Sequence, residues 1–312
     1  MNYVSVIVTF NRKKLLKQAI ESLLNQTLLP QKVIIVDNNS TDGTQEMITK
    51  LYSNNSLVKY CHLSQNNGGS AGFYAGLKEA LKEEDADWIS LSDDDAIYAE
   101  DYFEKLSQAH FNHPDVKVLS GTVLNGNHQI ETLHRRRIKN WNILSDYEVP
   151  VEEYQTNFFY DLFTFVGVVI NKEIVKQVGL PQKDFFIWFD DSEYSLRVHK
   201  LTKVLNVSDA KVYHKVKAKL ENNQWYPNWR EYYGMRNRIQ VIKKYGHPYL
   251  LTRAYFIALL ARKLIGNTVK SERKGYRRFM YRLFWDGFRD GIKNNLGKNN
   301  NYLPSTKIVK KK

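Results

Sequence analysis

The stretch Leu91-Ser92-Asp93-Asp94-Asp95-Ala96-Ile97 carries three consecutive carboxylates directly after an apolar run, Trp88 to Leu91. Such a run is typical of a buried strand, and like charges at its end need a counter-charge. A divalent cation such as Mg²⁺ or Mn²⁺ prefers hard oxygen ligands of this kind. In an extended strand Asp93 and Asp95 would point one way, leaving Asp94 for a sugar hydroxyl or a positive side chain. A solvated acidic turn is the competing interpretation.

The bulk composition is that of a globular protein. With 312 residues, 43% of them hydrophobic, the chain has room for one large or two smaller domains. The lone Cys61 excludes an internal disulfide and a multi-cysteine zinc site, and fits a reducing compartment. The N-terminal residues lack the basic region of a signal peptide. The apolar run from Ala254 to Ala261 is far shorter than the ~20 residues of a spanning helix. A cytoplasmic location is therefore expected.

The net charge of +13 is unevenly distributed along the chain. Residues 1–210 carry 21 basic and 28 acidic side chains, a net charge of −7. Residues 211–312 carry 25 and 5, a net charge of +20. This asymmetry predicts an acidic site in the first part and a C-terminal part that meets an anionic surface.

Apolar runs alternate with helical patterns through the first hundred residues. Strands are expected at 3–10, 33–36, 58–63 and 88–91, and helices at 13–25, 44–52 and around 75–81. Short connections between such elements predict an α/β fold with a mostly parallel sheet flanked by helices. Ligands bind beyond the carboxyl ends of these strands. The segments that fall there are Asn11, Asp37 to Asp42, Asn66 to Ser70 and Asp93 to Asp95.

The middle of the chain continues this pattern less regularly. Strands are expected at 116–123, 163–171, 204–207 and 211–214, with a helix around 174–178. Gly68-Gly69-Ser70-Ala71-Gly72 is either a tight turn or a close approach of backbone to a nucleotide or sugar. It does not follow the first strand, so it is not a dinucleotide-binding fingerprint. His134-Arg135-Arg136-Arg137 is either a mobile loop over phosphates or a solvated basic run.

Aromatic residues crowd a second acidic group in Phe185-Phe186-Ile187-Trp188-Phe189-Asp190-Asp191-Ser192-Glu193. Partial desolvation raises the pKa of a carboxyl group toward that of a general base. Asp190 and Glu193 would share one face of a starting helix. The competing interpretation is the ordinary enrichment of acids at helix N-termini. His214 would join the aspartate triplet only if the sheet returned it to Asp95.

From Trp225 onward the chain becomes basic and aromatic. A helix is expected at 230–245, where Arg236 would either bind a diphosphate or pack between domains. A second helix, 273–292, has an apolar face surrounded by arginines, as in a helix resting in a bilayer interface, with core packing as the competitor. The apolar face consists of Tyr276, Phe279, Met280, Leu283, Phe284, Phe288 and Ile292. The expected organisation is a nucleotide-sugar-binding and catalytic domain (1–218), a helical region (219–293) and a disordered basic tail (294–312).

Five segments taken together resemble the GT-A glycosyltransferases of family 2. They are Val4-Ser-Val-Ile-Val-Thr-Phe-Asn-Arg12, Ile34-Ile-Val-Asp-Asn-Asn-Ser-Thr-Asp-Gly-Thr44, Asn66-Asn-Gly-Gly-Ser-Ala-Gly-Phe73, the DxD-type Asp93 to Asp95, and Asp190-Asp-Ser-Glu193. They occur in the family's order over roughly the first 215 residues. The C-terminal third matches only loosely.

The resemblance implies a role for each matching position. Thr9, Asn11, Arg12, Asp37 and Asn39 would bind the base and ribose of the donor. Asn67, Gly68, Gly69 and Gly72 would line its diphosphate-sugar, and Asp94 and Arg236 would assist. Asp93, Asp95 and His214 would hold Mn²⁺ or Mg²⁺. Asp191 would be the base of an inverting displacement, and Asp190, Glu193 and Trp188 would bind the acceptor.

Within that family, the segments Asp-Asp-Asp-Ala, Trp-Phe-Asp-Asp-Ser-Glu-Tyr and Tyr-Tyr-Gly-Met-Arg-Asn-Arg are most similar to bacterial galactofuranosyltransferases. Rhamnosyltransferases that use dTDP-rhamnose come next. The resemblance implies a UDP-galactofuranose donor and a lipid-linked glycan acceptor for capsule, O-antigen or cell-wall polysaccharide. It also implies peripheral attachment to an anionic membrane, on the inner face of the plasma membrane.

Two other classes of protein fit the sequence less well. A nucleic-acid-binding module would suit the basic part, but no helix-turn-helix, RNP or zinc pattern occurs and the acidic part would repel phosphates. A nucleotide-sugar pyrophosphorylase would need a Lys/Gly-rich loop after its first strand, which is missing here. We therefore expect no nucleic-acid partner.

Overall fold

A computed structural model describes residues 1–215, 225–306, 308 and 310. The chain divides into two compact units. The first contains Met1–Arg137, Tyr147–Lys183 and Asp191–Val216; the second contains Ile138–Asp146, Asp184–Asp190 and Lys217–Lys312. The predicted cut after residue 218 falls outside the described residues. A single cut also misses two short segments, 138–146 and 184–190, that leave the first part of the chain and join the second unit.

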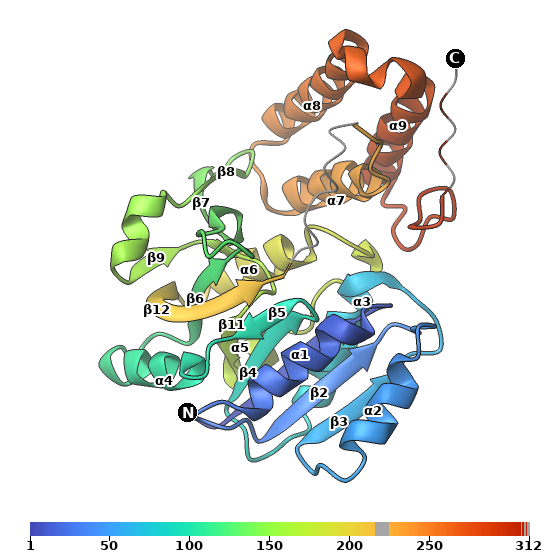
Figure 1. Cartoon of the computed structure of the whole chain (residues 1–312). Helices are drawn as coiled ribbons and strands as arrows, with labels where there is room; N and C mark the ends of the chain where they lie inside the picture. Colours follow the sequence, from blue (N-terminus) through green and yellow to red (C-terminus); the bar gives the residue numbers. More distant parts are fainter. Residues whose placement is uncertain (216–224, 307, 309, 311–312) are drawn as a thin grey trace. The chain divides into compact units, whose positions relative to one another are not determined.

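A large mixed sheet forms the centre of the first unit (Figure 1). In the described part of the chain its strand order is β3-β2-β1-β4-β11-β6-β12-β5, with β9 pairing β12. The strands are β1 (Tyr3–Thr9), β2 (Lys32–Asp37), β3 (Val58–His62), β4 (Trp88–Asp93), β5 (Ala96–Tyr98), β6 (Val118–Leu124), β9 (Phe158–Tyr160), β11 (Val168–Asn171) and β12 (Val204–His214). The block β3-β2-β1-β4 is parallel, as predicted, and β11 enters antiparallel between β4 and β6.

Alternating side chains of the strands supply two separate cores, one on each face of the sheet. On one face Tyr3 and Ile7 of β1 pack with α1, α2 and α4. On the other, Val4, Val6 and Val8 pack with α3, α5 and α6. These helices are α1 (Lys13–Leu24), α2 (Thr44–Tyr52), α3 (Gly68–Ala80), α4 (Tyr102–Asn112), α5 (Lys172–Val178) and α6 (Asp190–His199). A layer of helices on both faces explains why β1 and β2 read as continuous apolar runs.

The parallel register brings the loops after three strands to one edge of the sheet. Thr9 at the end of β1 pairs with Asp37 at the end of β2, and Val8 pairs with Asp93 at the end of β4. This confirms the prediction that the polar segments after these strands share one edge. They can therefore surround a common ligand.

Two expected strand boundaries are wrong. The run 163–171 is not one strand, because β10 (Leu162–Phe163) and β11 are separated by a turn in which Gly167 has φ of +69°. β10 instead joins β7 (Arg135–Asn140) and β8 (Ser145–Glu148) in a second sheet. The two short strands expected at 204–214 are one strand, β12, whose register against β6 shifts between Val207 and Lys211.

The second unit is mainly helical, with α7 (Arg230–Tyr245), α8 (Tyr249–Val269) and α9 (Arg277–Lys293). Met280, Leu283 and Phe284 of the predicted bilayer-facing surface are at most 2% exposed, so core packing is the observed role of that face. Gly287 and Gly291 of α9 lie against the α7 backbone. The residues 271–276 form a short 3₁₀ segment, so this helix begins at Arg277 rather than Arg273. None of the described helices is long and apolar enough to cross a bilayer.

The prediction of a disordered tail is wrong for residues 294–306. Tyr302 is 2% exposed, its ring stacks on Tyr232 with centroids 4.5 Å apart, and its hydroxyl donates to Asp286 at 2.7 Å. Burial of an aromatic ring outweighs the polar composition of the surrounding segment. Residues 307, 309, 311 and 312 of the predicted tail lie outside the described part.

Candidate functional site

The aspartate triplet forms the first part of the site. Strand β4 ends at Asp93, and the turn after it directs both Asp94 and Asp95 to the guanidinium of Arg12. The expected alternation, with Asp94 facing away from Asp95, is therefore wrong, because the chain is no longer extended at these positions. Asp94 also accepts a 2.6 Å hydrogen bond from Thr9 Oγ1. Burial raises the pKa of Asp94 to about 6, against the opposing effect of Arg12 and Thr9.

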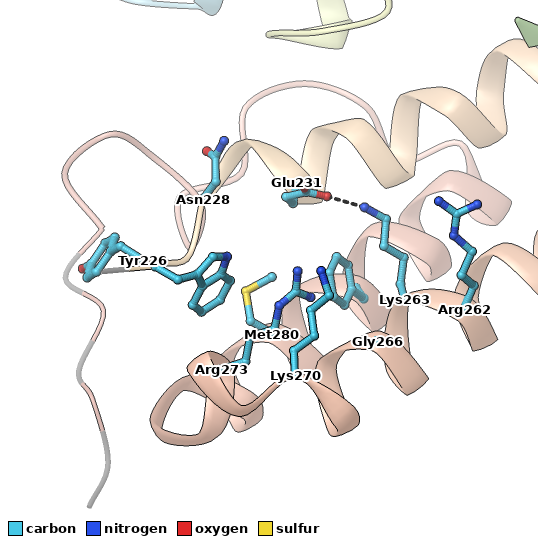
Figure 2. Close-up of a pocket in the computed structure, with 11 residues that line it drawn as sticks. Tyr226, Asn228, Glu231, Arg262, Lys263, Gly266, Lys270, Arg273 and Met280 are labelled. Atoms are coloured by element: carbon cyan, nitrogen blue, oxygen red, sulfur yellow. Dashed lines mark hydrogen bonds and ion pairs between the residues drawn. The ribbon is translucent and has the colours of Figure 1, made fainter. Parts of the chain in front are cut away.

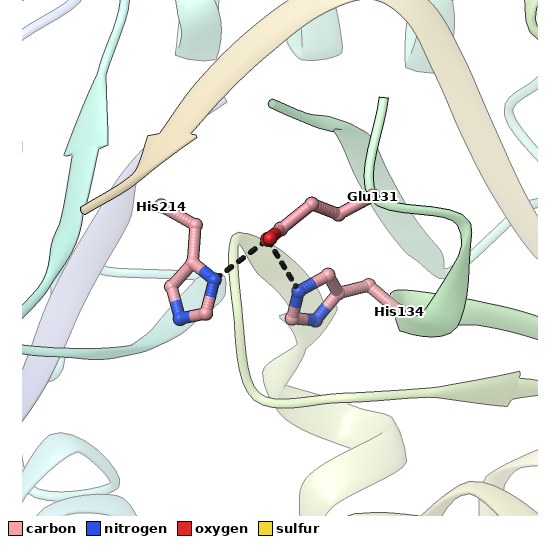
Figure 3. Close-up of side chains that lie close together, drawn as sticks. All are labelled: Glu131, His134 and His214. Carbon is pink, nitrogen blue, oxygen red and sulfur yellow. Dashed lines mark hydrogen bonds and ion pairs between the residues drawn. The ribbon is translucent and has the colours of Figure 1, made fainter. Parts of the chain in front are cut away.

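His214 meets the triplet at the end of β12. Its Nε2 lies 3.5 Å from Asp95 Oδ1, and its Nδ1 lies 2.7 Å from Glu131 Oε2. The same Oε2 lies 3.2 Å from Nε2 of His134, which ends the 3₁₀ segment Thr132–His134. Figure 3 shows the Glu131 carboxylate between the two imidazole rings. The sheet thus returns His214 to Asp95, as the resemblance requires.

The hydrogen bonds of this cluster determine where its protons lie. A carboxylate only accepts, so in a neutral imidazole Nδ1 of His214 carries the proton and donates to Glu131. Nε2 then presents a lone pair to Asp95 Oδ1, a buried oxygen that has no hydrogen-bond partner within the described residues. Two electron-pair donors facing each other at 3.5 Å fit a cation between them. Glu131 holds the imidazole from behind, the arrangement usual for a metal-bound histidine.

The pKa values of His134 and Glu131 are both lowered, but for different reasons. Burial lowers the pKa of His134 to about 4, so its imidazole is neutral at physiological pH. The hydrogen bond from His134 is the main cause that lowers the pKa of Glu131, and the bond from His214 adds to it. Glu131 is therefore an anion that orients both imidazole rings.

The basic segment after His134 is neither a mobile loop nor a solvated run. Arg135 is fully buried and donates to the carbonyl oxygens of Gly121 and Val166. Arg136 Nη2 donates to Ser192 Oγ at 3.0 Å. Arg137 pairs with Glu153 at 2.7 Å. The three successive arginines of β7 thus contact three different sets of partners. Arg136 is the one that contacts the second acidic group, through Ser192.

Asp191 lies at the start of α6, beside Arg136. Its Oδ1 accepts from the backbone N–H of Ser192 at 2.6 Å and from Ser192 Oγ at 3.1 Å. Burial raises the pKa of Asp191, and the charge of Arg136 acts in the opposite direction. A continuous series of contacts within the first unit therefore joins Asp95, through His214, Glu131 and the segment from His134 to Arg136, to Asp191. A half-buried carboxyl group of raised pKa suits general-base chemistry.

The aromatic residues before Asp191 form a strained loop in the second unit. Phe186, Trp188 and Phe189 have φ of +67°, +65° and +69°, which is costly for residues with side chains. Asn237 of α7 secures the loop: its Nδ2 lies 2.9–3.0 Å from the carbonyl oxygens of Phe185, Ile187 and Trp188. Trp188 is 39% exposed, whereas Asp190 is buried.

Two predicted site residues have structural roles instead. Arg236 is 1% exposed and donates to the carbonyl oxygens of Asp184, Phe185 and Gly297, so the predicted contact with a diphosphate is wrong. Glu193 is 3% exposed and pairs with Arg197 at 2.8 Å. The ion pair with Arg197 gives the Glu193 carboxylate an internal partner in place of an acceptor.

The predicted donor-binding residues after β1 and β2 support one another. Asn11 and Asn39 have φ of +54° and +65°, and Asn11 Oδ1 accepts from the backbone N–H of Thr41 at 2.7 Å. Asp37 is fully buried, where it accepts from Tyr60 Oη at 2.6 Å and from the backbone N–H of Ser40 at 2.8 Å. These bonds link the loops after the two strands.

The glycines at the start of α3 serve different purposes. Asn67 precedes the helix, Gly68 has φ of +85°, and a Cβ on Gly69 would meet no atom within 4 Å. A Cβ on Gly72 would lie 2.4 Å from Val8 Cγ1. Gly72 is thus required for close packing of α3 on β1, and its role in lining the sugar stays a prediction.

Comparison with known proteins identifies the family. The family model described as "Glycosyl transferase family 2" matches residues 5–175, more than half of the chain. The chain belongs to glycosyltransferase family 2. The matched range contains the aspartate triplet and the Glu131–His134 pair, and Asp191 and His214 follow it in the sequence.

The curated relatives of this family 2 glycosyltransferase have different names. The dTDP-rhamnosyl transferase RfbF of Shigella flexneri is 26% identical over 279 residues, 87% of this chain and 90% of the relative. The galactofuranosyltransferase GlfT1 of Mycolicibacterium smegmatis is 34% identical over 91 residues, 29% of each chain. The uncharacterized glycosyltransferase YwdF of Bacillus subtilis is 34% identical over 39% of this chain. The chain spans less than half the length of YwdF and GlfT1.

Solved structures agree on the fold. TarS 1-349 of S. aureus in complex with UDP-GlcNAc aligns with a TM-score of 0.58 and 16% identity, over 94% of this chain and 82% of the TarS 1-349 chain. GalNAc-T7 with UDP, GalNAc and Mn²⁺ aligns with a TM-score of 0.62 and 15% identity, over 94% and 56%. The predicted GT-A fold is confirmed, and the chain is a glycosyltransferase. GT-A glycosyltransferases commonly use a divalent metal.

Sequence reasoning missed three residues around the site: Glu131, His134 and Arg136 as a partner of Ser192. Glu131 and His134 are three positions apart, a spacing that recurs in metal sites, and this was the available signal. The pair gains meaning only through β12, which brings His214 to it from 80 residues away.

Proposed function

We propose that this protein is an inverting, metal-dependent glycosyltransferase that moves galactofuranose from UDP-galactofuranose to a hydroxyl of a lipid-linked glycan. The observation that carries the proposal is the series of contacts joining Asp95 and His214 to Asp191 within one unit. Inversion needs a base on one side of the anomeric carbon and a stabilised leaving group on the other. The aspartate triplet would supply the residues that stabilise the leaving group, and the acidic segment 190–193 would supply the base.

Asp93, Asp95 and His214 would hold Mn²⁺ or Mg²⁺. Such an ion, when bound, neutralises the diphosphate leaving group. The orphaned Oδ1 of Asp95 and the outward Nε2 of His214 support this assignment. Asp94 retains Thr9 and Arg12 at the triplet, and Arg12 would contact the base and ribose of the donor together with Thr9.

The donor would lie over the loops after β1, β2 and β3. Thr9, Asn11, Asp37 and Asn39 would contact the base and ribose, and the start of α3 at Asn67 to Gly69 would face the diphosphate-sugar. Backbone N–H groups at a helix N-terminus favour phosphate, which supports this orientation.

Asp191 would deprotonate the acceptor hydroxyl, and Trp188 and Asp190 would contact the acceptor. Ser192 and Arg136 orient the Asp191 carboxylate and stabilise its charge. The raised pKa of Asp191 supports its role as the proton acceptor.

The acceptor is proposed to be a lipid-linked glycan of a bacterial capsule, O-antigen or cell wall, reached by peripheral attachment to the inner face of the plasma membrane. One relative, from Campylobacter jejuni, is named GalNAc(5)-diNAcBac-PP-undecaprenol beta-1,3-glucosyltransferase, and it is 37% identical over 30% of this chain. The basic second part of the chain fits an anionic membrane surface. RfbF supports dTDP-rhamnose as the alternative donor, because its match covers most of both chains.

Two measurements test the proposed function. Donor hydrolysis across UDP- and dTDP-sugars, with and without manganese, should be highest for UDP-galactofuranose with the metal. Asp191→Asn should lower transfer by at least ~100-fold, because a general base contributes about that much, while UDP binding in the presence of manganese should be unchanged. Equal loss of transfer and of UDP binding would contradict the assignment of the base, and the exposed Glu173→Gln is the matched control.

A further inference from the structure

A hollow lies wholly within the second unit. It has a volume of about 350 Å³ and is formed by the start of α7, the C-terminal half of α8 and the 3₁₀ segment Ser271–Tyr276 (Figure 2). Residues 225–228 close one end of it. The function proposed above does not use this pocket.

Cations dominate the wall of the pocket. Arg262, Lys263, Lys270 and Arg273 line it against one acid, Glu231, which pairs with Lys263 at 2.7 Å. Arg273 stacks on Trp225, with its guanidinium carbon 4.9 Å from the ring centre. Its Nε is buried and has no hydrogen-bond partner within the described residues. Four cations around one hollow, against a single acid that already pairs with one of them, indicate a place for an anion.

Helix α8, which forms part of the pocket, presents an apolar face to solvent. Leu250, Ile257, Ile265 and Val269 of α8 are 61–79% exposed. Their spacing of seven, eight and four residues keeps them on one side of the helix. α8 contains no Asp or Glu, and Arg253 and Arg262 flank the apolar face. An exposed apolar row bordered by arginines is typical of a helix lying in a bilayer interface.

The two acids of α9 are directed inward. Asp286 and Asp290 are at most 8% exposed and accept from the hydroxyls of Tyr302 and Tyr232. With Glu231 paired to Lys263, these internal contacts leave the outer surface near α8 strongly positive. Such a surface attracts anionic headgroups and repels other cationic surfaces.

We propose that this pocket binds the phosphate of an anionic phospholipid headgroup while the apolar face of α8 rests in the bilayer interface. A guanidinium donates two parallel hydrogen bonds to a phosphate, and lysines add point charges. The exposed apolar row of α8 favours a lipid over a free phosphate as the ligand, because a soluble anion would leave these apolar side chains in water. The inference deepens the membrane part of the proposed function and assigns the attachment to α8, rather than to α9, whose apolar face is packed internally.

Vesicle co-sedimentation tests the proposal without donor or acceptor, so its result is independent of the transferase assignment. The full chain should bind phosphatidylcholine vesicles containing phosphatidylglycerol, and bind pure phosphatidylcholine vesicles weakly. Arg262→Gln combined with Lys270→Gln should weaken binding roughly 30-fold, since each basic residue at an anionic surface contributes about 1 kcal/mol, or roughly fivefold in affinity. The matched control, Arg278→Gln combined with Lys293→Gln on α9, should weaken binding threefold or less.

Further arms separate the competing explanations. Ile257→Ser with Ile265→Ser should also release the protein from vesicles, and glycerol phosphate should not displace the unsubstituted chain at equal concentration. Equal losses for both charge pairs, or displacement by glycerol phosphate, would overturn the proposal. In the unsubstituted chain, anionic vesicles should protect Lys270 from acetylation more than Lys293. The reverse order would also overturn it, and this measurement does not depend on any variant folding.

Discussion

At the scale of single residues, a carboxylate outside the aspartate triplet positions the histidine that faces it. Glu131 Oε2 lies 2.7 Å from His214 Nδ1, and this bond directs Nε2 to Asp95 (Figure 3). Loss of such a supporting carboxylate usually weakens metal binding ~10–100-fold. Glu131 is thus a positioning residue that acts through His214.

We expect Glu131→Gln to weaken manganese binding by about 10–100-fold. The amide can donate to either ring nitrogen, so it no longer selects the tautomer with a lone pair on Nε2. Manganese titration by electron paramagnetic resonance measures the affinity directly. Glu153→Gln, which breaks the nearby pair with Arg137, is the control and should leave the affinity unchanged. Equal affinity for Glu131→Gln and the unsubstituted chain would contradict the positioning role.

Arg136 affects the pH dependence of the proposed base. Its charge lowers the pKa of Asp191, which burial raises. In Arg136→Gln only hydrogen bonds, chiefly those from Ser192, still oppose the burial effect, so the pKa of Asp191 rises further and the carboxylate protonates at higher pH. The acidic limb of the kcat/KM profile should therefore move to higher pH. Arg137→Gln should leave that limb in place, and an unchanged limb in Arg136→Gln would show that Asp191 does not titrate in the rate.

At the scale of elements, the position of α3 depends on the absence of a side chain at Gly72. A Cβ there would lie 2.4 Å from Val8 Cγ1 and 2.9 Å from Asn38 Nδ2, so α3 would have to move away from β1. The start of the same helix is free of this constraint, because a Cβ on Gly69 meets nothing within 4 Å. The two glycines therefore form a matched pair.

Gly72→Ala should lower the free energy of unfolding by about 1–3 kcal/mol, the usual effect of overpacking. Gly69→Ala should be neutral or stabilise by up to about 1 kcal/mol, because alanine restricts the unfolded chain. Urea unfolding followed by circular dichroism measures both. Similar values for the two variants would contradict the packing role of Gly72.

The loop before Asp191 depends on another element, α7. Three residues of positive φ between Phe186 and Phe189 are held by Asn237, and Arg236 secures the loop from the same turn of the helix. Strained backbone of this kind persists only where its surroundings hold it. The Tyr-Gly-Met-Arg-Asn-Arg segment, which first suggested a phosphate contact, is the support of this loop.

At the scale of the whole molecule, the two units have separate interiors and opposite charge. The first has a core on each face of its sheet and holds the acidic groups. In the second unit, the segment that follows α9 packs against the helices, because Tyr302 stacks on Tyr232 and donates a hydrogen bond to Asp286. The C-terminal segment is therefore part of the folded second unit.

Tyr302→Ala should destabilise the protein by about 3–5 kcal/mol, the usual effect of removing a buried aromatic ring. Tyr302→Phe should cost about 1–3 kcal/mol, because Asp286 loses a buried hydrogen-bond donor. The exposed Tyr249→Ala should change stability by less than about 0.5 kcal/mol. Thermal unfolding separates the three variants, and a neutral Tyr302→Ala would contradict the packing of the tail.

The order of apolar runs in this chain determines the β1, β2 and β4 strands, their helices and the edge where Asp37 and Asp93 emerge. These follow from local periodicity, since a parallel sheet covered on both faces requires continuous apolar strands. Periodicity carries no information on which distant side chains meet. Only the tertiary structure brings Glu131 and His214 together, buries Arg236 and Glu193 beside internal partners, and exposes the apolar face of α8 instead of that of α9. Charged and amphipathic segments look alike in a sequence whether they face solvent, ligand or another helix, and long-range packing decides among these outcomes.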